Sequence, residues 1–341
     1  MGLVGIIANP AASKDIRRLV AQGRVVPDWE KVNTVRRVML GLQAVGENQI
    51  LAMADSSNLV RRAADDPKLA IELEFVDQPP FYSEGDTVRA AAVMAEAGVD
   101  CLVTLGGDGT NRAAVAGTRI LPMVAISTGT NNVFPTMVEG TLAGLAAGLV
   151  AGGRLDLAEV SVSSKIMNVY VDGELRDIAL IDVALSKERF VASKAIWDMD
   201  TLFEVFLTRA EPASIGLSSI GARLEAVSLA DEGGLRYSIA DTEESEEEGE
   251  VNPSRTVLAP IAPGVVPLVA ISSWQRMADN QRYLVEKRDC IVALDGERAF
   301  SVNRTQQLEI EVRRDGPPII DVDLALKVAA AKGLFDLAQG D

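Results

Sequence analysis

Residues 101–112 read Cys101-Leu102-Val103-Thr104-Leu105-Gly106-Gly107-Asp108-Gly109-Thr110-Asn111-Arg112, a hydrophobic segment that runs into three glycines and an acid. Glycine lets the backbone approach an anion closely, and free N–H groups at the start of a following helix point toward it. The stretch therefore predicts a strand, a phosphate-binding loop and a helix. A bare Gly-Gly-x-Gly would fit equally a tight turn with Asp108 as helix cap. The full Gly-Gly-Asp-Gly-Thr string after a hydrophobic strand favours the phosphate site.

Short β-branched segments alternate with amphipathic ones around this stretch. Strands are predicted at 3–8, 49–53, 71–76, 101–105 and 123–127. Helices are predicted at 14–21, 31–45, 57–64, 86–97, from about 111, and at 141–151. Such alternation indicates βαβ units and a doubly wound α/β domain with a parallel sheet. Ligands bind beyond the carboxyl ends of such strands, so the loops after Ala8, Leu105 and Ser127 are candidate sites.

The pattern changes after residue 151 to strand-like segments joined by short turns such as Asp172-Gly173. Strands are predicted at 157–162, 166–171, 178–185, 223–229, 236–239, 290–294, 298–302 and 308–312, and helices only at 194–208 and 324–337. We predict an α/β domain over 1–150, a mainly β domain over 151–322, and a C-terminal helix in 323–341 that could pack on the first domain. The acidic run 241–250 predicts a solvated loop rather than a metal site, because adjacent carboxylates repel.

Composition narrows the classes of function. The net charge of −16 disfavours nucleic acid and membrane as partners, since both attract Lys and Arg. The absence of histidine excludes Ser-His, Cys-His and His-metal chemistry. Without a signal peptide or an apolar run of about 18 residues, a cytoplasmic protein with reduced Cys101 and Cys290 is expected. The expected partner is a small molecule, and a homo-oligomer is left open.

Two further loops carry polar residues suited to a nucleotide. Residues 128–132 offer hydroxyl, amide and backbone N–H groups, although Thr and Asn also suit a capping turn. Asn9 could bond a nucleotide, whereas Lys14 fits a phosphate contact and a solvated first-turn lysine equally well. The candidate nucleotide-binding residues are therefore Asn9, Lys14, Gly106, Gly107, Gly109, Thr110, Asn111, Thr128, Gly129, Thr130, Asn131 and Asn132.

Neither Gly-x-Gly-x-x-Gly nor Gly-x-x-x-x-Gly-Lys-[Ser/Thr] follows a predicted strand of the first domain, which disfavours a dinucleotide-binding oxidoreductase. The motifs instead resemble those of the superfamily of NAD kinases, diacylglycerol kinases and sphingosine kinases. Residues 106–110 are identical to its Gly-Gly-Asp-Gly-Thr signature. Asn9-Pro10 matches an Asn-Pro of the lipid kinases, and residues 128–132 are similar to their Gly-Thr-Gly-Asn loop. The form Gly-Thr-Asn-Asn-Val-Phe-Pro is similar to the acetoin-catabolism X branch, which is ATP-NAD kinase-like.

The resemblance covers residues 1 to about 185 well and implies an α/β domain followed by a β-rich one. Asp182 falls where NAD kinases carry an Asn-Glu pair that contacts the dinucleotide, with Ile181 in place of the amide. Asp295-Gly296-Glu297 is similar to an Asp-Gly-Glu turn of the lipid kinases, although a plain β-turn fits equally. The Thr-Pro-Thr-Gly-Ser-Thr-Ala-Tyr segment of the NAD pocket has no counterpart, and residues 214–221 could take its place. The acceptor is therefore left open.

The resemblance implies an ATP-dependent kinase that uses Mg²⁺ to transfer a phosphoryl group to a hydroxyl of a small molecule, NAD being one candidate. Asp108 is the expected central carboxylate, orienting the hydroxyl or holding Mg²⁺. An ordinary Asp pKa of ~3.9 makes it a weak base. Asp182 is the expected second catalytic acid, with Asp295 and Glu297 as further candidates. The alternatives are a non-catalytic nucleotide sensor and a lipid kinase, which would need a basic or apolar patch facing the membrane.

Overall fold

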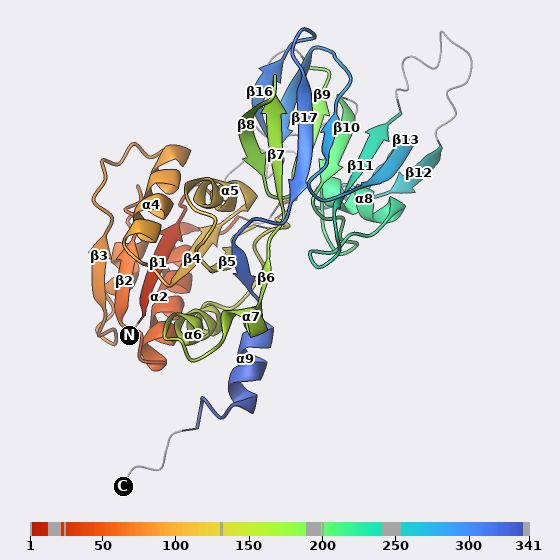
Figure 1. Ribbon diagram of the computed structural model, residues 1–341. Helices are drawn as coiled ribbons and strands as arrows, with labels where there is room; N and C mark the ends of the chain where they lie inside the picture. Colours follow the sequence, from red (N-terminus) through yellow and green to blue (C-terminus); the bar gives the residue numbers. More distant parts are fainter. Residues whose placement is uncertain are drawn as a thin grey trace, which may run out of the picture.

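The computed structural model describes residues 2–12, 22–23, 25–129, 132–188, 199, 201–240 and 254–336, except the side chain of Arg298. The chain forms an α/β half and a β-rich half (Figure 1), which confirms the predicted fold class. The helices are α2 (Asp28–Ala44), α3 (Leu59–Ala64), α4 (Glu84–Glu96), α5 (Asp108–Gly117), α6 (Gly140–Ala151), α7 (Leu157–Val160), α8 (Leu217–Leu224) and α9 (Val322–Ala331). None of the helices within the described ranges is long and apolar enough to cross a membrane.

The α/β half is built on a seven-stranded sheet with the order β3-β2-β1-β4-β5-β18-β6. Its strands are β1 (Leu3–Ala8), β2 (Gln49–Ala52), β3 (Glu72–Phe75), β4 (Cys101–Gly106), β5 (Met123–Ser127), β6 (Ser161–Ser163) and β18 (Pro318–Ile320). Every neighbouring pair is parallel except β6 with β18. The five strands predicted for the first domain are therefore confirmed as a parallel sheet.

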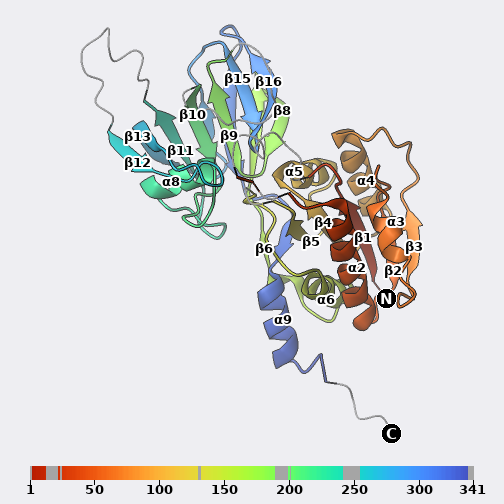
Figure 2. The ribbon, with the colours of Figure 1, turned by 180° about the vertical axis from the view of Figure 1, so that it is seen from behind.

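Both faces of this sheet are covered by helices (Figures 1 and 2). Val4 and Ile6 of β1 pack in a cluster with α2, α3, α6 and α9, whereas Ile7 packs in another with α4 and α5. Successive side chains of a strand point to opposite faces, so a continuous apolar run becomes buried on both sides. This is the doubly wound arrangement that the sequence predicts.

The β-rich half contains two antiparallel sheets with the orders β12-β13-β11-β10-β9-β15-β16 and β14-β17-β7-β8. The first holds β9 (Asp182–Ser186), β10 (Leu202–Leu207), β11 (Gly234–Ile239), β12 (Arg255–Leu258), β13 (Leu268–Met277), β15 (Cys290–Leu294) and β16 (Glu297–Val302). The second holds β7 (Ile166–Val171), β8 (Glu174–Ala179), β14 (Arg282–Leu284) and β17 (Leu308–Arg313). Val169 and Ile310 of one sheet share a hydrophobic cluster with Phe206 of the other, so the sheets pack face to face.

The chain returns to the α/β half near its end. β6 and β18 lie within residues 151–322 and nevertheless pair in the first sheet, next to β5. α9 contacts α6 and α7 (Figure 1). The domain boundaries at 150 and 322 stay predictions, whereas the contact of the last helix with the α/β half is observed.

Two predicted strands of the second half have different boundaries in the structure. The strand predicted at 157–162 begins as α7, because the Asp156 carboxylate accepts a hydrogen bond from the Ala158 N–H and starts a helical turn. The strand predicted at 178–185 is broken between β8 and β9. Its backbone N–H groups at Leu180 and Ile181 bond to the Asp295 side chain instead of a neighbouring strand.

Two further predictions for this half are wrong. Residues 202–207 were predicted to be helical but form β10, which pairs with β9 and β11 in the middle of a sheet. Val205 and Phe206 face different hydrophobic clusters, and a strand buried on both faces carries an apolar run that resembles a helix. The strand predicted at 223–229 begins inside α8. The predicted helix at 14–21 and the acidic run at 241–250 lie outside the described residues.

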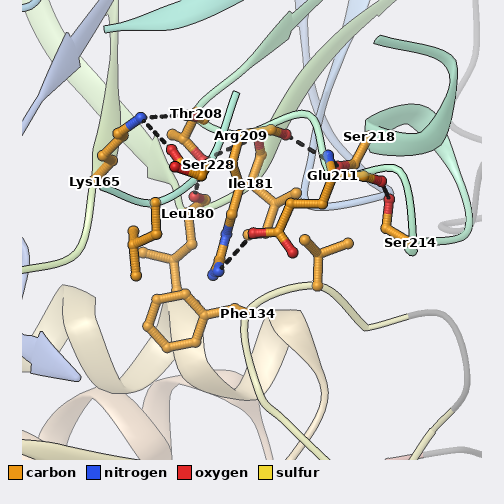
Figure 3. A network of polar contacts seen from close by, with 12 residues as sticks. Phe134, Lys165, Leu180, Ile181, Thr208, Arg209, Glu211, Ser214, Ser218 and Ser228 are labelled. Carbon is orange, nitrogen blue, oxygen red and sulfur yellow. Dashed lines mark hydrogen bonds and ion pairs between the residues drawn. The ribbon is translucent and has the colours of Figure 1, made fainter. Parts of the chain in front are cut away.

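Lys165 joins three segments of the β-rich half. Its side chain is buried, and Nζ donates to the carbonyl oxygens of Thr208 (3.1 Å) and Ser228 (2.9 Å) (Figure 3). It also donates to the Gly233 carbonyl at 2.8 Å. Burial, and to a lesser extent Arg314, lowers the pKa of Lys165 to about 8. The group is therefore an ammonium at neutral pH, and its three donors match three acceptors.

Replacing Lys165 by methionine is expected to lower the free energy of unfolding by about 1–3 kcal/mol, because buried carbonyl groups lose their donor. Urea unfolding of both proteins at pH 7 measures the difference. Lys327→Met is the control, since the Lys327 ammonium is exposed and pairs with the exposed Asp323. This substitution should change stability by less than about 0.5 kcal/mol. Equal stability of Lys165→Met and wild type would contradict this role.

Candidate functional site

The order of the first sheet reverses at β1, which lies between β2 and β4. Ligands of open α/β sheets bind outside the carboxyl ends of the strands at such a point. Asn9 follows β1, and the glycine-rich loop follows β4 on the other side of this point. β5 pairs with β4, with Gly106 opposite Ser127, so the third predicted loop lies beside the second. The fold therefore brings all three predicted loops to one edge.

Hydrogen bonds connect the three loops. The Asn9 side-chain amide donates to Oγ1 of Thr110 at 2.8 Å, and the Asn9 backbone N–H donates to the Leu105 carbonyl at 2.9 Å. The Thr128 N–H donates to the Gly106 carbonyl at 3.2 Å. Asn9 and Thr110, both predicted from the sequence, thus form one contact, and the loops form a single unit.

Asp108 makes the strongest contact between the glycine-rich loop and the loop after β5. It is the first residue of α5, and its carboxylate accepts hydrogen bonds from the backbone N–H groups of Val133 (3.1 and 3.2 Å) and Phe134 (2.8 Å). The helix begins three residues earlier than predicted, and its N-cap is Gly107, which offers no side-chain cap. Asp108 is therefore no helix cap, although its charge suits the positive end of the helix.

The glycines of this loop differ in the space around them. A Cβ atom on Gly106 would lie 2.5 Å from Oγ1 of Thr110, and one on Gly107 would lie 2.9 Å from Oδ1 of Asn132. A Cβ atom on Gly109 would have no neighbour within 4 Å. Close packing thus accounts for the first two glycines, while Gly109 leaves open space at the start of α5.

The remaining predicted residues are placed as follows. Asn111 is buried, and its side chain accepts from Oγ1 of Thr104 (2.6 Å) and donates to the Gly107 carbonyl (2.8 Å), so it supports the loop from inside. The Asn132 side chain donates to Oγ of Ser127 at 2.8 Å and lies against Gly129. Lys14, Thr130 and Asn131 lie outside the described residues.

Thr128 has a hydroxyl group without an evident protein partner. Its side chain is buried, and Oγ1 makes no hydrogen bond to any residue within the described ranges. An unpaired buried hydroxyl costs about 1–3 kcal/mol, so such a group marks a place for a ligand or water.

Sequence reasoning missed Lys31, which supports the first loop. Its side chain is buried in α2, and Nζ donates to the carbonyl oxygens of Pro10 (2.7 Å) and Ala12 (2.8 Å). The signal was present, because Lys31 stands in register with Val35 and Val38 on the buried face of the helix. A lysine at an apolar position of a helix predicts a buried partner for its charge.

A pocket lies between the two halves. Asp108 and Val133 line it from the α/β half, and Asp182, Asp295 and Gly296 line it from the β-rich half. Residues 215–218, at the start of α8, form another part of its lining, as expected for the segment 214–221. The three predicted aspartates thus meet at one pocket. Among the described residues, no group of three His, Cys, Asp or Glu side chains is placed to hold a metal ion.

The two acids of the β-rich half differ in their surroundings. Oδ1 of Asp182 accepts from the Gly296 N–H at 3.1 Å. The Asp295 side chain is fully buried and accepts from the N–H groups of Leu180 (3.0 Å) and Ile181 (2.7 Å). Burial raises the pKa of Asp295 to about 7, although Arg112 acts in the opposite direction. Asp295 therefore holds the backbone beside Asp182, in a hairpin turn where its own φ of 50° and the 77° of Gly296 are both positive.

Arg209 of the β-rich half faces the third loop, a contact that sequence reasoning missed because no motif marks it. Its guanidinium group lies 5.7 Å from the centre of the Phe134 ring and 3.4 Å from the Glu211 carboxylate (Figure 3). Oγ of Ser218 donates to the Arg209 carbonyl at 3.0 Å and accepts from the Glu211 N–H at 3.1 Å. A cation over a ring is attractive, so this contact joins the pocket lining to the phosphate-loop side.

Gly107→Ala is expected to lower the free energy of unfolding by about 1–3 kcal/mol, because its methyl group must displace Asn132 and separate the loops. Gly109→Ala is the matched control, since the same methyl group meets open space in the first turn of α5 and alanine favours a helix. Urea unfolding measures both variants. An equal effect of the two substitutions would show that the loop contact has no influence on stability.

Comparison with known proteins gives matches to both halves of the chain. Residues 4–154 match the family model of the ATP-NAD kinase N-terminal domain, and residues 165–315 match that of the acetoin catabolism protein X C-terminal domain. Two solved structures from Bacillus anthracis str. Sterne are distantly similar. One, proposed to be a diacylglycerol kinase, has a TM-score of 0.46 and 14% identity, covering 94% of this chain and 96% of that chain. The other, a diacylglycerol kinase, has a TM-score of 0.43 and 12% identity, with the same coverage of 94% and 96%.

Similarity to one curated protein extends over nearly the whole chain. The acetoin catabolism protein X of Cupriavidus necator is 38% identical over 345 residues, which cover 98% of this chain and 94% of that protein. The resemblance found in residues 9–10, 106–110 and 128–135 is thereby confirmed. The chain belongs to the acetoin catabolism protein X family, and its first half is an ATP-NAD kinase-type N-terminal domain.

Proposed function

We propose that this protein is a kinase that transfers a phosphoryl group from ATP to a hydroxyl group of a small molecule. The observation that carries the proposal is the pocket where Asp108, at the start of the glycine-loop helix, meets Asp182 of the other half. A pocket at the carboxyl edge of a parallel sheet, between two halves, is where such folds bind their substrates. ATP would bind on the loop side and the acceptor on the side of the β-rich half.

Three features of the α/β half support a phosphate site. The N-cap residue of α5 is Gly107, which has no side chain to bond the N–H groups of the first turn, and the start of a helix favours an anion. Gly109 leaves space there, and the Thr128 hydroxyl has no hydrogen-bond partner within the described ranges. In this proposal Lys14, Thr130 and Asn131 complete the contacts with the nucleotide.

The acids of the pocket would repel a triphosphate, so a cation is required. Mg²⁺ usually takes only one or two carboxylates and completes its shell with phosphate oxygens and water. Asp108 and Asp182 suit this purpose, because both line the pocket and carboxylate oxygen is the ligand that Mg²⁺ prefers. The bound ion would neutralise charge that develops on the phosphoryl group.

In the proposed reaction the acceptor oxygen attacks the γ-phosphorus of ATP, and the bond to the ADP oxygen breaks. Asp108 and Asp182 orient the acceptor hydroxyl, and one of these carboxylates takes its proton late in the transfer. Ile215 and Leu217 line the pocket beside Ser218, which suits a small molecule with apolar and polar parts. The matched relative is named for acetoin catabolism, so acetoin, which carries a hydroxyl group, is one acceptor to test beside NAD.

The first measurement is ADP formation from ATP and Mg²⁺ with NAD, acetoin, glycerol, a sugar or diacylglycerol as acceptor. We expect ADP and a phosphorylated product with one of the soluble acceptors. Phosphorylation of diacylglycerol alone would support a lipid kinase instead. ATP binding without turnover on any acceptor would support a non-catalytic nucleotide sensor. One observation favours the nucleotide sensor as a second candidate. The Asp108 carboxylate already accepts hydrogen bonds from the backbone N–H groups of Val133 and Phe134, so it has a structural role without any substrate.

Asp108→Asn is expected to lower kcat by about 10²-fold or more, because a neutral amide cannot replace the carboxylate toward the acceptor hydroxyl and Mg²⁺. Steady-state kinetics with the identified acceptor measures the loss. Asp100→Asn is the control, since the Asp100 carboxylate also accepts a backbone N–H, that of Leu3, but is exposed and does not line the pocket. A wild-type kcat in Asp108→Asn would refute the catalytic role.

A further inference from the structure

Arg112 ends the opening motif and has no role in the proposed reaction. It stands on α5 one turn after Asp108, and its side chain is 9% exposed. The guanidinium group lies 2.9 Å from Glu84, 3.5 Å from Asp177 and 3.6 Å from Asp295. These four residues are called the Arg112 cluster below.

The Arg112 cluster connects the two halves of the molecule. Glu84 begins α4 in the α/β half, whereas Asp177 lies in β8 and Asp295 in the turn between β15 and β16. Arg112 and Asp295 are buried, whereas the side chains of Glu84 and Asp177 are 49% and 34% exposed. Removing one member of the buried pair leaves the other charge without its partner, which is far more costly than the loss of an exposed pair. The Arg112–Asp295 pair is therefore the main electrostatic connection of this cluster between α5 and the β-rich half.

The connection continues from Asp295 to the pocket. Asp295 accepts hydrogen bonds from the N–H groups of the segment 180–182, including that of Asp182 at 3.3 Å. In return, the Asp182 carbonyl accepts from the Asp295 N–H at 2.9 Å, and its carboxylate accepts from the Gly296 N–H at 3.1 Å. Asp182 is thus held by the same turn that Arg112 contacts. Any shift of that turn relative to α5 moves Asp182 relative to Asp108.

We propose that Arg112 is a positioning residue, which fixes the β-rich half on α5 and thereby sets the place of Asp182 opposite Asp108 across the pocket. The inference rests on the proposed function for its catalytic consequence, but the placement of the two halves can be measured without any substrate. A guanidinium group suits this role, because its planar set of donors reaches several carboxylates at once.

The test compares Arg112→Met and Arg112→Lys with wild type by measuring a distance between the halves. Spin labels are placed on Glu96→Cys in α4 and Glu174→Cys in β8, both exposed positions. The native Cys101 and Cys290 are buried, and burial raises the pKa of their thiols to about 12 and about 11, so they stay unlabelled. Double electron–electron resonance then reports the distribution of distances in the full chain.

Wild type should give one narrow distribution, and Arg112→Met should broaden it by about twofold, since movement between domains is the default where their interface is weak. Arg112→Lys should recover part of the narrow distribution, because an ammonium can pair with one carboxylate at a time. Arg119→Met is the matched control. Arg119 also joins the halves, through Asp315 at 3.2 Å, but both partners are partly exposed and the width should not change.

An unchanged width in Arg112→Met, the same broadening in Arg119→Met, or no recovery in Arg112→Lys would each overturn the proposal. Urea unfolding confirms that each variant is folded. If Arg112→Met does not fold, the distance distribution of Arg112→Lys is compared with that of wild type instead. With an active acceptor, kcat of Arg112→Met should fall by about 10²-fold while its affinity for ATP stays that of wild type. Absence of turnover in wild type would refute the proposed function and leave the distance measurement to judge the positioning role.

Discussion

The hydrogen bonds from the backbone N–H groups of Val133 and Phe134 to the Asp108 carboxylate hold the predicted site together. Bonds to a charged acceptor are stronger than neutral ones, and the negative charge lies at the favourable end of α5. The loop after β5 is also joined to the glycine loop by the bond from the Thr128 N–H to the Gly106 carbonyl, which links two neutral groups. The same carboxylate lines the pocket, so its orientation there is set by the loop that it stabilises.

In the β-rich half, too, backbone N–H groups bind the side chain of an aspartate. Asp295 binds backbone N–H groups across a break between two strands, just as Asp108 binds them across two loops. The difference is the cation beside it, since a fully buried carboxylate needs a partner and Arg112 provides one. Asp108 of one half and Asp182 of the other therefore reach the pocket in positions that depend on backbone hydrogen bonds rather than on a flexible side-chain pair, and Asp295 lines the pocket beside Asp182.

The sequence predicts best what short stretches determine. β1 and β5 have the predicted bounds, and the glycine loop has its predicted place, because hydrophobic runs and glycines act within a few residues. The break after β8 could not be predicted, since it depends on Asp295 more than a hundred residues away along the chain. The strand β10 was not predicted either. Burial on both faces removes the alternation of apolar and polar residues that marks a strand. Lys31 could have been found, because a charged residue interrupts an otherwise apolar helical face.

Charge explains why the proposed reaction would need an added cation. The chain carries a net charge of −16, and three aspartates line the pocket. Arg112 and Arg209 are already engaged, Arg112 with three carboxylates and Arg209 with Glu211 and the Phe134 ring. Since these guanidinium groups are held by protein acids, they organise the two halves and are poorly placed to neutralise a polyphosphate. In the proposed reaction Mg²⁺ would then supply the charge neutralisation, and aspartates facing the pocket are the side chains that such an ion would require.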